Sequence, residues 1–302
     1  MRTIVLAVIV LLLAVPPVSA QKAKQKNAGY PPSFPEAKAE VYKTVGDVKL
    51  NLYVFNPPGH MATDKRPAIV FFFGGGWTNG NPRQFEQQCK HLAGRGMVAI
   101  TADYRVASRH QVKAVSCVAD AKSAIRYVRK EAARLGIDPD KIAAGGGSAG
   151  GHIAACTGTI PDFDEMGEDT SISSVPNAMV LFNPALVLAP VKGLKLDQGR
   201  VASLSDRMGV DPQKLSPYHH VRKGAPPTLI LHGKADSTVP YATAEAFAKA
   251  MTAAGNQCEL IGYEGQPHGF FNYGRGDGSH YEKTLAAMDG LLEKLGFLPA
   301  AE

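Results

Sequence analysis

The stretch Gly146-Gly147-Ser148-Ala149-Gly150 stands between a short apolar run, residues 141–145, and a segment with helical character, residues 148–157. Its pattern, G-x-S-x-G, is typical of a sharp turn from a strand into a helix. The turn forces the serine into an unfavourable backbone conformation and lifts its hydroxyl clear of the sheet. The residues two before and two after the serine then crowd each other, which favours glycine at both places. The pattern therefore predicts Ser148 as a nucleophile at the start of a helix, beside the positive end of the helix dipole.

Apolar runs with the length of strands alternate with amphipathic helical segments on both sides of this turn. Such alternation predicts an α/β fold, in which helices cover both faces of a mostly parallel central sheet. A hairpin around residues 45–47 predicts an antiparallel edge, and the irregular region 184–223 is predicted to form a small lid. The strands are expected at residues 39–42, 48–55, 67–73, 97–102, 141–145, 178–182, 228–231 and 259–263, and the helices at residues 115–135, 148–157, 242–254 and 281–295.

A second glycine-rich stretch, Phe73-Gly74-Gly75-Gly76-Trp77, ends the predicted strand 67–73. Backbone N–H groups approach a reacting centre only where side chains are absent, and three consecutive glycines make such a bare loop. We therefore expect the N–H groups of Gly75, Gly76 and Ala149 to form an oxyanion hole, which stabilises negative charge on a substrate oxygen. An ordinary glycine loop without this role is the alternative.

Asp236 and His268 are the candidates for the acid and the base that would activate Ser148. For a serine on this type of turn, the acid and then the histidine follow along the chain. Asp236 comes just after the predicted strand 228–231, and His268 comes after the predicted strand 259–263. Both therefore fall at the carboxyl ends of neighbouring strands, at the same edge of the sheet as Ser148. The alternative is a surface aspartate and a histidine packed in the core.

Further aromatic and imidazole side chains near these motifs are candidates for contact with a substrate. His152 lies four residues after Ser148 on the same helix face, and the alternative for it is a hydrogen-bonded core histidine. His219 and His220 could reach a substrate from the predicted lid, whereas His232, at a strand end, is expected to be structural. The four residues predicted to line the substrate site are Trp77, His152, His219 and Phe270.

Two other kinds of site compete for these residue types. Gly145, Gly147 and Gly150 also match G-x-G-x-x-G, the fingerprint of dinucleotide binding, but no acidic residue follows at the end of a second strand as that site requires. The cysteines are too widely and irregularly spaced for a metal motif such as C-x-x-C. We therefore expect no cofactor and no metal. Disulfide pairing and buried free thiols both remain open for Cys89, Cys117, Cys156 and Cys258.

The composition predicts a globular protein, and the N-terminal residues predict that it is exported. The chain has 302 residues, 45% hydrophobic and 20% charged, which suits one domain with its own core. Arg2, the apolar run 4–15 and the small residues up to Ala20 are typical of a signal peptide cleaved after Ala20, and a retained signal anchor is the alternative. The expected order is a signal peptide at 1–20, a flexible tail at 21–37 and an α/β domain at 38–302. The protein is expected to be secreted or periplasmic.

The charge and hydropathy of the remaining chain exclude two classes of partner. Cleavage would remove the single charge of Arg2 and lower the net charge from +6 to +5, an excess too mild and too dispersed to predict nucleic-acid binding. The sequence has no second long apolar stretch, so no stable membrane association is expected. The oligomeric state stays open at this level.

Taken together, these motifs resemble the α/β-hydrolase superfamily over roughly residues 38–296. More narrowly, they resemble the hormone-sensitive-lipase-like esterases and the related bacterial feruloyl-esterase and acetyl-xylan-esterase-like group. The esterase loop usually begins with a histidine, and Phe73, which stands in that place, cannot make the bracing hydrogen bonds of a histidine. The resemblance is carried by residues 73–77, Asp103-Tyr104-Arg105, residues 120–126, 146–151 and 232–236, and Pro267-His268-Gly269.

The resemblance implies a serine carboxylesterase that forms an acyl-enzyme and acts on a small-molecule or oligosaccharide ester. The expected esters carry short acyl groups, or are acetyl or feruloyl esters derived from plant polysaccharides. A serine peptidase of the prolyl-oligopeptidase type shares the order of the triad, but usually carries a large extra domain for which this chain has no room. A non-catalytic binding protein on the same fold would lack a triad residue, whereas Ser148, Asp236 and His268 are all present.

Overall fold

The computed structural model describes residues 29–195 and 204–300. The predicted signal peptide, 1–20, and the predicted tail up to residue 28 lie outside the described residues. The chain divides into two units, residues 1–33 and 34–302, and the sheet belongs to the second. Phe34 precedes the predicted start of the domain, yet it is buried and packs edge-on against Tyr53. Across the described ranges, no helix has the length and apolar character needed to cross a membrane.

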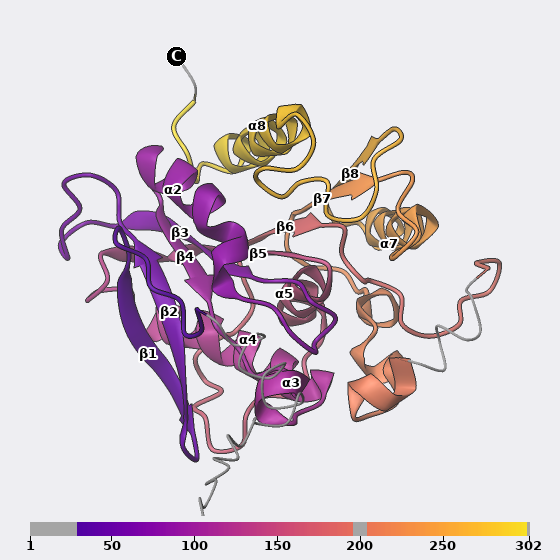
Figure 1. Cartoon of the computed structure of the whole chain (residues 1–302), viewed down its shortest axis with the longest axis horizontal. Coiled ribbons are helices and arrows are strands. Elements are labelled where there is room, and N and C mark those ends of the chain that lie inside the picture. Colours follow the sequence, from indigo (N-terminus) through magenta and orange to yellow (C-terminus); the bar gives the residue numbers. More distant parts are fainter. Residues whose placement is uncertain (1–28, 196–203, 301–302) are drawn as a thin grey trace, which may run out of the picture. The chain divides into compact units, whose positions relative to one another are not determined.

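A single eight-stranded sheet runs through the second unit in the order β1-β2-β4-β3-β5-β6-β7-β8 (Figure 1). β1 pairs antiparallel with β2, and β2 with β4, whereas the remaining neighbours are parallel. The mostly parallel sheet and its antiparallel edge are therefore confirmed. The strands are β1 (Lys38–Val45), β2 (Val48–Phe55), β3 (Arg66–Phe72), β4 (Val98–Ala102), β5 (Ile137–Gly147), β6 (Ala178–Phe182), β7 (Thr228–Gly233) and β8 (Cys258–Tyr263).

Helices cover both faces of the sheet. Successive residues of a strand point to opposite sides, so an apolar strand gives both faces apolar side chains that must be covered. Val70 and Phe72 of β3 belong to the core cluster that includes residues of α4, α5 and α7, whereas Ile69 and Phe71 belong to the cluster that includes residues of α2 and α8. Figure 1 shows α2 and α8 above the sheet and α4 and α5 below it. Burial on both faces explains why residues 68–72 of β3 form an unbroken apolar run. The helices are α2 (Glu86–Gly94), α3 (Ala107–His110), α4 (Ala114–Lys130), α5 (Ala149–Thr159), α7 (Tyr241–Ala253) and α8 (Ser279–Lys294).

Two elements between β3 and β4 are not predicted by the sequence pattern: α2 and the 3-10 helix η1 (Pro82–Phe85) before it. The residues of α2 are mostly polar, and its buried apolar residues are Cys89, Leu92 and Ala93. These are too few to show a helical repeat. α4 ends at Lys130 rather than at residue 135, and residues 131–136 form turns that end at Gly136, whose φ of +64° favours glycine.

A buried group of charges fastens β1 and the segment after β4 to α4. Asp120 on α4 is fully buried and accepts hydrogen bonds from the guanidinium of Arg105 at 2.7 Å and from the Arg105 N–H at 2.9 Å. Lys43 Nζ lies 2.7 Å from the same carboxylate, and Glu165 contacts both Lys43 and Arg105 at 2.6 Å. The cations of Lys43 and Arg105 are thus both paired with the carboxylates of Asp120 and Glu165, so the buried charge of Asp120 is balanced.

The four cysteines carry free thiols, so the disulfide alternative is not realised in this structure. Cys89 packs on the face covered by α2 and α8, whereas Cys117 and Cys156 pack on the opposite face. Burial raises the pKa of the half-buried Cys258 thiol to about 12. Protonated and buried, such thiols pack as small apolar side chains.

Candidate active site

The turn at Ser148 joins β5 to α5. Ser148 has φ of 55° and ψ of −118°, a conformation that residues other than glycine rarely adopt. A Cβ atom on Gly146 would lie 2.5 Å from the carbonyl carbon of Gly150, and one on Gly150 would lie 2.0 Å from the carbonyl oxygen of Phe72. Both glycines are therefore required by the close approach of the backbone, as the crowding argument predicts.

Ser148, His268 and Asp236 form a continuous line of hydrogen bonds, although they come from three different loops. His268 Nε2 lies 2.9 Å from Ser148 Oγ, and His268 Nδ1 lies 2.7 Å from Asp236 Oδ2. The three residues follow β5, β8 and β7, whose parallel arrangement brings their carboxyl ends to one edge of the sheet. With Nδ1–H donated to the carboxylate, Nε2 is left to accept the proton of the serine hydroxyl.

The Asp236 carboxylate is buried and held from several sides. Its Oδ1 accepts from the N–H of Val239 at 2.8 Å, and its Oδ2 accepts from Asn183 Nδ2 at 3.0 Å and lies 3.2 Å from His232 Nε2. Burial favours the neutral acid, but the hydrogen bonds from His232, His268 and Val239 outweigh it and hold the pKa of Asp236 well below its usual value. Asp236 is therefore charged at neutral pH and fixed in orientation.

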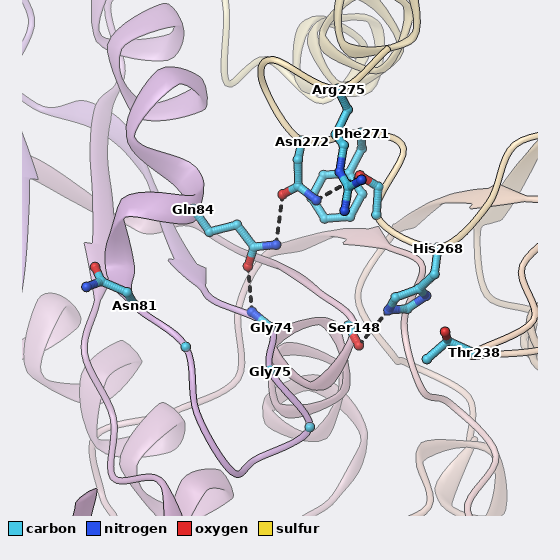
Figure 2. A pocket seen from close by; sticks show the side chains of 13 residues that line it. Gly74, Gly75, Asn81, Gln84, Ser148, Thr238, His268, Phe271, Asn272 and Arg275 are labelled. Atoms are coloured by element: carbon cyan, nitrogen blue, oxygen red, sulfur yellow. Dashed lines mark hydrogen bonds between the residues drawn. The ribbon is translucent and has the colours of Figure 1, made fainter. Parts of the chain in front are cut away.

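The loop after β3 lies beside Ser148 (Figure 2). Gly75 and Gly76 have φ of 128° and 62°, values that favour glycine, and both line the pocket that contains Ser148. A Cβ atom on Gly75 would lie 2.2 Å from the carbonyl oxygen of Asn79, so no side chain fits there. Ala149 is the first residue of α5, where an N–H group has no partner within the helix. The N–H groups of Gly75, Gly76 and Ala149 can thus serve an oxyanion near Ser148.

The glycine loop is braced without the histidine that usually precedes it. The N–H of Gly74 donates to Gln84 Oε1 at 2.6 Å, and the carbonyl oxygen of Phe73 accepts from the Tyr104 hydroxyl at 2.6 Å. The Phe73 ring stacks on Tyr104, with the ring centroids 4.1 Å apart. Side chains from η1 and from the segment after β4 therefore supply hydrogen bonds that the Phe73 side chain cannot make.

A pocket of about 530 Å³ contains Ser148 and His268 (Figure 2). Gln84 and Asn272 face each other across one end of it, and Gln84 Nε2 donates to Asn272 Oδ1 at 2.9 Å. Within the described ranges, no three His, Cys, Asp or Glu side chains are grouped so that they could hold a metal ion. Five glycines line the pocket together with Asn81, Gln84, Ser148, Thr238, His268, Phe271, Asn272 and Arg275.

The pocket around Ser148 is lined by none of the four side chains predicted to contact a substrate, so that contact stays a prediction. Trp77 and His152 are buried and satisfy each other: Trp77 Nε1–H donates to His152 Nδ1 at 3.1 Å, and His152 Nε2–H donates to the carbonyl of Leu215 at 2.7 Å. Burial lowers the pKa of His152 to about 4, so the ring is neutral. His219 Nδ1 lies 2.8 Å from the Ser216 hydroxyl and His219 Nε2 lies 3.4 Å from the carbonyl oxygen of Pro190, and Phe270 is buried.

The described part of the predicted lid, residues 184–195 and 204–223, contributes no residue to the pocket at Ser148. It contains the 3-10 helices η2 (Pro212–Leu215) and η3 (Pro217–His220). Asp206 and Arg207 line a neighbouring depression, which also includes Gly76 and Trp77. Residues 196–203 lie outside the described residues, so the lid stays a prediction.

Several residues that the sequence analysis does not single out have places in the site. Asn183 directly follows β6, and its side chain bridges the Asp236 carboxylate and the backbone after His268. A polar residue directly after a buried strand at this edge is a signal that could have identified it. Gln84, Asn272 and Arg275 carry no such signal, because they lie on η1 and on a loop rather than at strand ends.

A mostly parallel sheet with a serine at a strand-to-helix turn, and with an aspartate and a histidine at the same edge, defines an α/β-hydrolase. A family model described as BD-FAE matches residues 52–251, well over half of the chain. The chain belongs to the BD-FAE family. A second model, described as dienelactone hydrolase family, matches residues 209–299.

Solved structures of Thermogutta terrifontis esterase 2 are similar to most of this chain. The form phosphonylated by sarin is 54% identical, covers 90% of this chain and 99% of that chain, and has a TM-score of 0.88. The butyrate-bound form is 55% identical with the same coverage and a TM-score of 0.86. These likenesses confirm the predicted fold and the resemblance to carboxylesterases.

Curated relatives from Mycobacterium tuberculosis are more distant. Esterase LipC is 29% identical over 221 residues, which cover 70% of this chain and 54% of LipC. Carboxylesterase NlhH is 27% identical over 281 residues, which cover 85% of this chain and 83% of NlhH. The chain spans about half the length of LipC and of LipM, a probable carboxylic ester hydrolase from the same organism.

Proposed function

We propose that this chain is a serine carboxylic ester hydrolase. The observation that carries the proposal is the line of hydrogen bonds from Asp236 through His268 to Ser148, which ends in a pocket bounded by Gly75 and Gly76. A serine hydroxyl is a weak nucleophile, and a base within hydrogen-bonding reach activates it. The esterase and carboxylesterase names of similar proteins support an ester rather than an amide as the scissile bond.

In the first half of the reaction, His268 Nε2 removes the proton from Ser148 Oγ while this oxygen attacks the carbonyl carbon of the ester. The carbonyl oxygen becomes an oxyanion, which the N–H groups of Gly75, Gly76 and Ala149 stabilise. The bond from the carbonyl carbon to the alcohol oxygen then breaks. His268 returns its proton to the departing alcohol, and the acyl group remains on Ser148.

In the second half, a water molecule replaces the alcohol. His268 Nε2 takes one proton from this water while its oxygen attacks the acyl carbon, and the same oxyanion forms again. Ser148 Oγ then leaves, takes the proton back from His268, and releases the free acid. Asp236 stays ionised throughout, since its pKa is held well below its usual value, and it stabilises the imidazolium form of His268. These steps need no cofactor.

The substrates belonging to this proposal are short-acyl esters, including acetyl esters, and feruloyl esters derived from plant polysaccharides. Thermogutta terrifontis esterase 2 is solved with propionate and with butyrate bound, which supports short acyl groups. The polar side chains of Gln84, Thr238, Asn272 and Arg275 in the pocket support hydrophilic esters over long-chain lipids.

Export belongs to the proposal as well and rests on the sequence of residues 1–20. It is tested by expressing the whole chain and sequencing the N-terminus of the protein recovered from the periplasm or the medium. A mature chain that begins at Gln21 supports export with cleavage after Ala20. Recovery of the protein only from the cytoplasm with residues 1–20 intact would overturn it.

The activity is tested with the purified protein on p-nitrophenyl esters of increasing acyl length, methyl ferulate, acetylated xylan and a panel of aminoacyl amides. Ser148→Ala is the matched control, because it removes one oxygen from the line of hydrogen bonds and should lower kcat by about a millionfold. Ester hydrolysis that depends on Ser148 supports the proposal. Cleavage of the amides alone, or no labelling of Ser148 by a fluorophosphonate probe, would overturn it.

A further inference from the structure

Arg275 lines the pocket, but the proposed reaction steps do not use its side chain. It lies on an exposed loop shortly after His268, and its backbone N–H donates to the carbonyl of Asn272 at 3.2 Å. Figure 2 shows its side chain extending from this loop toward Ser148. The guanidinium therefore reaches into the same pocket as the nucleophile, whereas the backbone that carries it is outside the core.

The charge of Arg275 is not balanced by the pocket. Among the residues that line it there is no Asp or Glu, and Arg275 is the single Lys or Arg. Within the described part of the chain, no ion pair and no side-chain hydrogen bond engages its guanidinium. Asp277, on the same loop, instead accepts hydrogen bonds from the N–H and the hydroxyl of Ser279, at 3.0 and 2.8 Å.

The neighbouring polar side chains, by contrast, are already engaged with the protein. Gln84 accepts from the N–H of Gly74 and donates to Asn272, and Asn272 Nδ2 donates to the carbonyl of Gly269 at 2.8 Å. Figure 2 shows the side chain of Asn81 turned away from Ser148. The amides of Gln84 and Asn272 each use one of their N–H donors within the protein, whereas the guanidinium of Arg275 is charged and has none of its donors engaged by the described residues.

A guanidinium presents paired N–H donors in a plane, which matches the two oxygens of a carboxylate. We infer that the pocket takes esters that also bear a carboxylate group, and that Arg275 binds this carboxylate. The inference rests on the proposed ester hydrolysis and narrows its substrate class. The carboxylate belongs either to the acyl part, as in a half-ester of a dicarboxylic acid, or to the alcohol part, as in an O-acylated hydroxy acid.

The expected preference is modest because Arg275 is exposed. Charge pairs open to water are weakened by solvent and by salt. We expect about a fivefold higher kcat/KM for an anionic ester than its intrinsic reactivity predicts, expressed mainly as a lower KM. This preference should shrink as the ionic strength rises.

The experiment uses two pairs of substrates that differ by one carboxylate. For the acyl side, the p-nitrophenyl half-ester of glutaric acid is compared with p-nitrophenyl pentanoate. For the alcohol side, para-acetoxybenzoate is compared with para-acetoxybenzamide. Rates measured with Ser148→Ala are subtracted, and concentrations of active enzyme come from titration with a fluorophosphonate probe. For each pair, the specificity ratio is the kcat/KM of the anionic ester divided by that of the neutral ester.

The decisive variant is Arg275→Met, which keeps the length of the side chain and removes its charge. Comparing ratios between enzymes cancels the intrinsic reactivity of each ester. Lys65→Met is the matched control, since Lys65 is an exposed cation in the loop before β3, at the opposite end of that strand from the glycine loop. It changes the net charge equally without touching the pocket. Arg275→Lys tests whether charge alone suffices.

The inference predicts that Arg275→Met lowers the specificity ratio of at least one pair about fivefold, mainly by raising the KM of the anionic ester. Lys65→Met should keep the wild-type ratio. The pair that responds identifies the side of the ester bond that carries the carboxylate. Equal ratios in wild type and Arg275→Met for both pairs, with the neutral esters hydrolysed, would overturn this inference and leave the proposed function standing. Hydrolysis of no ester by the wild-type protein would overturn both.

Discussion

Gln84 accepts a hydrogen bond from the backbone N–H of Gly74 at 2.6 Å and so ties η1 to the glycine loop beside Ser148. The amide nitrogen of Gln84 donates to Asn272, which in turn donates to the carbonyl of Gly269, next to His268. One chain of side-chain amides thus links the loop that would hold the oxyanion to the loop that carries the base. These hydrogen bonds brace the glycine loop, which the side chain of Phe73 cannot do because it has no hydrogen-bonding group.

Gln84→Ala should lower kcat for a p-nitrophenyl ester by about tenfold, with a smaller change in KM. The brace of Gly74 would be lost, so the neighbouring N–H donors would be less well oriented toward an oxyanion that exists only during the reaction. Steady-state kinetics measure the two constants separately. Gln257→Ala, at an exposed position before β8, is the matched control. A Gln84→Ala enzyme with wild-type kcat would show that the brace is dispensable.

Asp236→Asn should lower kcat by about ten-thousandfold while leaving the fold intact. An amide cannot hold His268 in the tautomer that keeps Nε2 free to accept the serine proton, and it provides no charge to balance the imidazolium. The measurement is single-turnover hydrolysis with unfolding curves as the check on folding. Asp47→Asn, in the exposed turn between β1 and β2, provides a control for the chemistry of the substitution. A loss below tenfold would contradict the role assigned to Asp236.

The free energy of unfolding should fall with acidification because of His152. Its pKa is about 4 in the folded protein, whereas that of an unfolded histidine is about 6.5. Between these values the unfolded state binds the extra proton, so stability is present above pH 6.5 and is lost as the pH falls toward 4. The loss should reach about 2 kcal/mol at pH 5.

Denaturant unfolding of wild type and His152→Gln at pH 7.5 and pH 5 measures this effect. The variant cannot take up a proton at this position, so its stability should fall by about 2 kcal/mol less between the two values. Asp236 does not affect this comparison. Its pKa lies below the usual value, so its contribution to the free energy of unfolding is lost only at a more acidic pH than 5. Parallel pH dependences of the two proteins would contradict the prediction.

Asp120→Ala should reduce the free energy of unfolding by about 3 kcal/mol or more. The substitution leaves the cations of Lys43 and Arg105 facing Glu165 alone, in a part of the protein where Asp120 itself is fully buried. Urea unfolding measures the midpoint, with the slope as a check for two-state behaviour. Asp140→Ala, at an exposed position of β5, should change the midpoint little. Equal midpoints for the two variants would contradict the prediction.

The sequence by itself identifies the three residues of the hydrogen-bonded line, Ser148, His268 and Asp236. Gly146 and Gly150 reveal the turn at Ser148 because such a turn brings these two backbones together, and a Cβ atom on Gly146 would meet the carbonyl group of Gly150. Asp236 and His268 can be placed because parallel strands bring residues at their carboxyl ends to one edge, so topology alone makes them neighbours of Ser148. The succession of most strands and helices along the chain follows from periodicity, because most elements carry their own signal, whereas α2 and η1 do not.

Only the tertiary structure decides which side chains share the pocket with these residues. His152 is on the same helix face as Ser148, but the packing of α5 turns it toward Trp77 and Leu215, away from the pocket. Gln84 and Arg275 enter the pocket from a 3-10 helix and a loop, which have no long repeat that could predict the direction of a side chain. Their placement depends on contacts between segments far apart in the sequence, and such contacts leave no local pattern.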